Sequence, residues 1–115
     1  MNIEQLRNYC LSKKGVTDSF PFDDVTLVFR VMNKMFALTS LEGELSINLK
    51  CDPEKAIELR EEYDAVLPGF HMNKKHWNTV IIDGSIADEQ IFGWIDDSYR
   101  LAADNLTKAK KELIM

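Results

Sequence analysis

The chain of 115 residues is 45% hydrophobic and 29% charged, proportions that fit one folded domain with a core and exclude a disordered chain. No run approaches the roughly 20 consecutive apolar residues that cross a bilayer, so we expect no membrane-spanning helix. The formal net charge of −5 argues against a surface that is basic throughout. The N-terminal residues lack the pattern of a signal peptide, so we expect a cytoplasmic protein with a single domain, residues 1–115.

The first half of the chain predicts one helix and then three strands. Asn2 can cap a helix of roughly residues 3–13, with Gln5 completing a capping box. Residues 25–31 and 35–41 are rich in β-branched and aromatic side chains, and Asn33-Lys34 between them suits a tight turn. Residues 45–51 alternate strictly between apolar and polar side chains, as in a strand with one face on a core. We therefore expect an antiparallel meander.

The second half predicts a helix, two strands and a final helix. Asp52 suits the N-cap of the first of these helices, and Pro53 suits its first turn. Residues 70–72 and 77–82 are expected to be strands, residues 88–105 a long helix, and residues 108–115 a frayed tail. The order α-β-β-β-α-β-β-α then gives an α+β domain, in which helices cover one face of an antiparallel sheet. The other face is left for a partner.

The most distinctive segment is residues 70–80, which hold two Lys, two His, two Asn and a Trp, while residues 65–80 contain no acidic side chain. Cations bind phosphate, amides form hydrogen bonds and an aromatic ring stacks on bases, so the segment predicts contact with nucleic acid. Basic residues on two strands and at one hairpin tip would extend this surface. The candidate residues are Arg30, Lys34, Lys50, Asn73, Lys74, Lys75, His76, Trp77 and Asn78. A second interpretation places Trp77 in the core and Lys74-Lys75 in a solvated turn.

Other chemistries find less support. Cys51, His71 and His76 fall short of the four ligands of a structural zinc site, so we expect no metal. Cys10 and Cys51 fit small buried hydrophobes better than nucleophiles, and the glycines are dispersed rather than gathered in a phosphate loop. We therefore expect no cofactor and no enzymatic activity.

Two further positions allow alternative interpretations. The segment Phe20-Pro21-Phe22 fits either a plug buried beneath the first helix, which we favour, or an exposed aromatic lip for a ligand. Gly93 falls inside the final helix, where it costs about 1 kcal/mol relative to alanine. Close packing of another element against Gly93 would explain that choice.

Several segments, taken together, resemble one known family. They are Tyr9-Cys10-Leu11-Ser12, Phe20-Pro21-Phe22, Leu27-Val28-Phe29-Arg30-Val31, Lys34-Met35-Phe36-Ala37-Leu38, Leu49-Lys50-Cys51-Asp52-Pro53, residues 71–80 and Ile95-Asp96-Asp97-Ser98-Tyr99. In this order they resemble the MmcQ/YjbR family of small bacterial proteins over nearly the whole chain. Similar proteins often carry a proline where this chain has Ala87. The resemblance implies a CyaY-like α+β fold, also described as a double-wing arrangement, and DNA binding.

The sequence therefore predicts a monomeric, non-enzymatic DNA-binding protein of the MmcQ/YjbR type. Neutralising three or four phosphates gives a salt slope of only about −3 to −4, so the binding to DNA should be weak and salt-dependent. The alternative is a domain that binds a protein or a small anionic ligand through the same surface.

Overall fold

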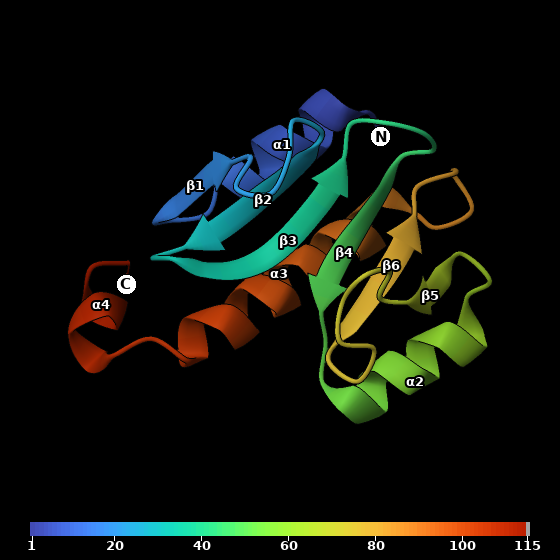
Figure 1. Cartoon of the computed structure of the whole chain (residues 1–115). Helices are drawn as coiled ribbons and strands as arrows, with labels where there is room; N and C mark the ends of the chain where they lie inside the picture. The colour runs from blue at the N-terminus through green and yellow to red at the C-terminus, as the bar shows by residue number, and fades with distance from the viewer. Residues whose placement is uncertain (115) are drawn as a thin grey trace.

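The computed structural model describes residues 1–114 as a six-stranded antiparallel sheet packed against helices (Figure 1). The strand order is β1-β2-β3-β4-β6-β5. The elements are α1 (Ile3–Leu11), β1 (Val16–Ser19), β2 (Thr26–Val31), β3 (Lys34–Ser40), β4 (Ser46–Lys50), α2 (Pro53–Glu62), β5 (Val66–Pro68), β6 (Trp77–Ile81), α3 (Asp88–Asp104) and α4 (Lys108–Glu112). No helix in this part of the chain is both long and apolar enough to cross a membrane.

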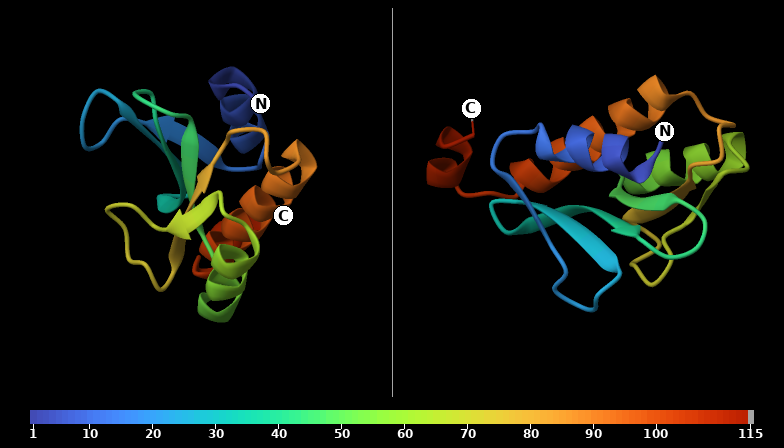
Figure 2. Two further views of the ribbon diagram at one scale, coloured as in Figure 1. Left: turned by 90° about the vertical axis from the view of Figure 1, so that its right-hand side faces the viewer. Right: turned by 90° about the horizontal axis from the view of Figure 1, so that it is seen from above.

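Helices α1, α2 and α3 lie on the same side of the sheet, as the two views of Figure 2 show. The main hydrophobic core fills the space between them and the strands, and Phe29, Phe36 and Ile47 contribute to it from the sheet. Leu6 of α1 and Ile95 of α3 meet these strand residues and are fully buried. The predicted α+β class, with helices on one face of an antiparallel sheet, is confirmed.

Local signals start the helices where the sequence predicts. The Asn2 side chain accepts a hydrogen bond from Gln5 N, and the Gln5 side chain accepts one from Asn2 N, completing a capping box. Asp52 caps α2 through Lys55 N, with Pro53 in the first turn. Ala87 offers no side-chain cap, so α3 depends on its buried face for its position.

Four local predictions need correction. Residues 70–72 form no strand, and β5 lies earlier at Val66–Pro68. The short strand β1 was not predicted, because four residues give too little alternation to recognise. Positive φ angles place the first hairpin turn at Met32 and Asn33, one residue earlier than expected. The expected tail contains helix α4, and its last residue, Met115, lies outside the described residues.

Candidate functional site

The helices leave one side of the sheet uncovered. We call this side the open face, and cross-strand pairing assigns residues to it in rows. One row runs from Val28 on β2 through Leu38 and Asn48 to Thr79 on β6 and Leu67 on β5. A second row, toward one end of the sheet, pairs Arg30 with Met35 and Lys50 with Trp77.

A small second core covers part of the open face. It consists of Val28, Leu38 and Trp77, with Met35 and Met72 packed against them. The Trp77 side chain is only 6% exposed. The interpretation that buries Trp77 therefore matches the structure, and the indole is not available for stacking on a partner in this conformation.

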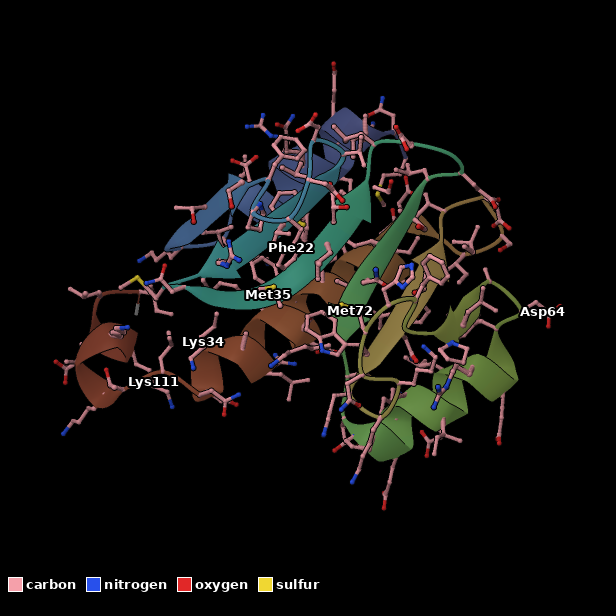
Figure 3. The ribbon with its side chains drawn as sticks, in the orientation of Figure 1. Phe22, Lys34, Met35, Asp64, Met72 and Lys111 are labelled. Carbon is pink, nitrogen blue, oxygen red and sulfur yellow. The ribbon has the colours of Figure 1, made fainter. Side chains whose placement is uncertain are left out.

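Two loops rise from the open face and enclose a groove with a volume of about 720 Å³. Residues 20–25 form one loop and residues 69–76 the other, and both project to the side opposite the helices (Figure 2). Phe22 and Phe70 line the groove, one from each loop, and are 63% and 68% exposed. Asn48 and Thr79 also line it, from the sheet. Figure 3 shows Phe22, Met35 and Met72 gathered over the middle of the sheet.

The structure exposes the segment Phe20-Pro21-Phe22 instead of burying it beneath α1. Phe20 is 46% exposed, and it lies in a separate hollow beside α1 rather than in the groove. A buried plug at these positions is therefore wrong. The sequence of residues 20–22 does not decide between burial and exposure, because aromatic side chains occur both in cores and in ligand-facing loops.

Hydrogen bonds within the chain hold both loops in place. The Asp23 carboxylate accepts hydrogen bonds from Val25 N at 2.9 Å and Thr26 N at 2.6 Å, and these bonds lower the pKa of Asp23. In the other loop, Phe70 N donates to Thr79 Oγ1 at 2.9 Å and Lys74 Nζ donates to the Gly69 carbonyl at 2.9 Å. These hydrogen bonds hold the two loops in a defined conformation, so the groove between them has a defined shape.

Cations border the end of the open face where β4 finishes. Lys50 Nζ lies 5.7 Å from the centroid of the Trp77 ring, within cation–π range. Arg30 Nη1 donates to Ser19 Oγ at 3.1 Å. Lys75 and His76 are exposed in the loop that follows Lys74. Lys50 and His76 line one hollow at this end of the sheet, and Lys75 precedes His76 in the same loop.

The remaining candidates have other positions. Asn78 is 3% exposed and faces the helices, where its Nδ2 donates to the Ala56 carbonyl at 3.2 Å. Lys34 pairs with Val31, a residue of the main core, so it lies at the end of the sheet on the helix side. Asn73 uses Oδ1 to accept a hydrogen bond from Lys75 N and so shapes its own turn. Asn78 and Lys34 therefore do not contribute to the open face.

The acidic residues are distributed very differently. Within the six described strands, Asp18 alone is acidic, and its Oδ2 pairs with Arg7 Nε of α1 at 2.7 Å on the helix side. The other acids of the described residues lie on helices, loops and turns. The negative charge of the chain is therefore concentrated away from the open face, although Asp23 stands at one lip of the groove.

Cys51 and His76 line one hollow at the end of β4, but burial disfavours the reactive thiolate form of both cysteines. Cys10 is buried, and burial raises its pKa to about 12. Burial also raises the pKa of the half-buried Cys51, and nearby Asp52 adds to the shift. Among residues 1–114, no three His, Cys, Asp or Glu side chains converge as metal ligands.

A family model described as YjbR matches residues 11–101. The chain belongs to the YjbR family. It is 36% identical over 116 residues to the uncharacterized protein YjbR of Escherichia coli strain K12, covering 100% of this chain and 98% of that one. It is 38% identical over 112 residues to the uncharacterized protein YbdF of Escherichia coli O157:H7, covering 96% and 92%.

Solved structures share the YjbR fold. The crystal structure of Deinococcus radiodurans protein DR2400 superposes with a TM-score of 0.90 at 37% identity and covers 98% of this chain and 87% of that one. A crystal structure of a Pseudomonas syringae protein gives a TM-score of 0.76 at 30% identity, covering 89% and 99%. The family resemblance noted in the sequence is thus confirmed.

Sequence reasoning missed three residues that define the groove. Phe70 was assigned to a strand, Phe22 was favoured as a buried residue, and Asn48 was treated as an ordinary solvated strand position. One sequence signal places Asn48 on the open face: it is a polar residue in the alternating pattern of β4, whose apolar residues face the core.

Proposed function

We propose that this YjbR protein binds nucleic acid through the open face of its sheet. The observation that carries the proposal is the separation of charge: Arg30 and Lys50 project from the open face, while the one acidic strand residue, Asp18, faces α1 within the described sheet. A polyanion approaching the end of the open face where β4 finishes meets Lys50 and the exposed Lys75, in spite of the net charge of −5. Asp23 at one lip of the groove, and Asp52 and Asp104 in a hollow beside Lys50, oppose this attraction. The expectation of DNA binding fits this asymmetry.

Four cations account for the proposed contact. Arg30, Lys50, Lys74 and Lys75 neutralise phosphates, and His76 borders the same region. Four phosphates give a salt slope of about −3 on a single strand and about −4 on a duplex, so binding weakens steeply toward physiological salt. Trp77 contributes indirectly, because its buried ring supports the stem and ammonium of Lys50.

A second candidate function follows from the groove itself. Its walls are largely apolar, with Leu38, Met35 and Met72 among the side chains that line it. A small ligand or a protein segment with an apolar group would fit there, and its binding would depend little on salt. This candidate uses the same open face without phosphate contacts.

The double variant Lys50→Gln, Lys75→Gln tests the first function against the second. Removing two phosphate contacts should make the salt slope for DNA shallower by about 1.5 to 2 and weaken binding at low salt. Lys74 is kept, since its ammonium holds the Gly69 carbonyl. Lys108→Gln on the exposed surface of α4 is the matched control. An unchanged slope in a double variant with wild-type circular dichroism would contradict the assignment.

We further propose that the protein acts as a cytoplasmic monomer without catalytic activity. Burial of the Cys10 thiol, which disfavours its thiolate form, supports this part of the proposal. Sedimentation of the purified protein should give a single species of about monomer mass, and a concentration-dependent dimer would contradict this part of the proposal.

A further inference from the structure

We propose that the groove on the open face binds an unpaired nucleic-acid strand, with a base between Phe22 and Phe70 and the adjoining phosphates at Lys50 and Lys75. This binding mode rests on the function proposed above and specifies which form of nucleic acid is bound. Its evidence is the shape of the groove, the polar groups that line it and the position of the cations relative to both.

The two lips of the groove suit a base that is free of its partner. Phe22 and Phe70 are 63% and 68% exposed on loops that stand above the sheet on opposite sides. In a duplex the bases are stacked inside and only their edges are reachable from the grooves, so a ring on a raised loop can stack on a base only by wedging between base steps. An unpaired base presents its π face, on which an aromatic side chain stacks whatever the sequence. The Phe70 ring is itself packed against His71, with 4.1 Å between ring centroids.

Polar groups line the sheet side of the groove. The Thr79 hydroxyl donates to Asn48 Oδ1 and accepts a hydrogen bond from Phe70 N. Because Asn48 Oδ1 accepts the bond from Thr79, the amide nitrogen Nδ2 of Asn48 is the other free group of this side chain. Asn48 Nδ2 makes no hydrogen bond within residues 1–114. The ring carbonyls and nitrogens of a nucleobase are acceptors for such an amide. A purely apolar group in the same place would leave it unpaired, which is costly once water is excluded.

The cations come from the strand and the loop that border the groove. Lys50 follows Asn48 by two residues on β4, so both side chains are on the open face about 7 Å apart along the strand. Lys75 belongs to the loop that carries Phe70. A base above Asn48 therefore has Lys50 beside it on β4 and Lys75 on the loop that carries Phe70.

Fluorescence anisotropy with a labelled oligothymidine and with a labelled duplex of equal length tests this binding mode at low salt. We expect the single strand to bind more tightly than the duplex, and Phe22→Ala and Phe70→Ala each to weaken strand binding about tenfold. Phe20→Ala, which removes an exposed ring outside the groove, should leave it unchanged. Circular dichroism establishes that each variant is folded.

The outcomes separate the two proposals. A duplex that binds as tightly as the strand, with both Phe variants equal to wild type, would overturn the unpaired-strand mode and leave nucleic-acid binding intact. The absence of binding to either probe at low salt would overturn both. Loss of strand binding in Phe20→Ala but not in Phe22→Ala would place the contact outside the groove and contradict the assignment.

Discussion

Lys50 and Trp77 are register partners on β4 and β6, and the Lys50 ammonium lies 5.7 Å from the centroid of the Trp77 ring. The ring is buried beneath Met72 and Met35, while the half-buried lysine lies at the edge of the same cluster. A small core on the open face therefore supports one of the cations proposed to contact phosphate.

Shortening the Met72 side chain should expose the indole ring of Trp77 to solvent. Met72→Ala removes side-chain atoms packed against the cluster of Val28, Leu38 and Trp77, so we expect a red-shifted emission maximum and stronger acrylamide quenching. Trp94→Phe in both proteins isolates the signal of Trp77. Equal quenching with and without Met72 would show that the 69–76 loop does not shield the ring.

Ser98 joins α3 to two strands, and its loss should be costly. Its hydroxyl donates to the Phe36 carbonyl and accepts from Lys50 N at 2.8 Å, with the side chain fully buried. Ser98→Ala leaves both backbone groups without that partner, so the free energy of unfolding should fall by about 1–3 kcal/mol. Urea denaturation measures the change. Ser12→Ala, at an exposed helix end, is the control, and an equal effect of the two substitutions would contradict the account.

Two glycines should respond to alanine in opposite directions. A Cβ at Gly69 would lie 2.9 Å from the Trp77 carbonyl oxygen, whereas a Cβ at Gly93 meets no heavy atom of the described residues within 4 Å. Gly69→Ala should therefore destabilise the protein by about 1–3 kcal/mol. Gly93→Ala should stabilise it by about 0.5–1 kcal/mol, because alanine is the better helix former. Thermal unfolding measures both, and a lower Tm for Gly93→Ala would show a packing constraint there.

The Cys10 thiol should be protected in the folded protein. Burial raises the pKa of Cys10 from its ordinary value of 9.0 to about 12, so the folded chain keeps a proton that the unfolded chain releases. This contribution to stability is present at neutral pH and is lost as pH rises above about 9. In Cys51→Ala, the remaining Cys10 should react with a disulfide reagent at pH 8 only after unfolding by urea. Rapid reaction without urea would contradict its burial.

The sequence predicted the helices well because their signals are local. Asn2 with Gln5 and Asp52 with Pro53 act within one helical turn, and the buried stripe of α3 repeats with the helical period. The placement of β5 failed because three residues ending in proline carry no alternation that distinguishes them from the loop that follows.

The positions of the candidate residues were predicted only in part, for a different reason. Lys50, Lys74, Lys75 and Arg30 border the open face as their basic character suggested, but Asn78 faces α2 because neighbouring strand residues alternate between faces. The predicted solvent-facing role of Trp77 depended on what covers it, and Met72 comes from a loop whose path no local pattern reveals. The expectation of close packing at Gly93 was wrong, since a Cβ there meets no heavy atom of residues 1–114 within 4 Å. A glycine inside a helix does not by itself reveal what packs against it.

An amide chemical-shift titration with short mixed-sequence DNA, offered as a single strand and as a duplex, tests the central claim most directly. Binding by the open face predicts shifts at Arg30, Lys50, Asn48 and residues 69–76 at low salt, which shrink toward physiological salt. Residues of α1 and α3 should stay unshifted. A flat titration with both forms at low salt, or shifts confined to the helices, would contradict nucleic-acid binding by the open face.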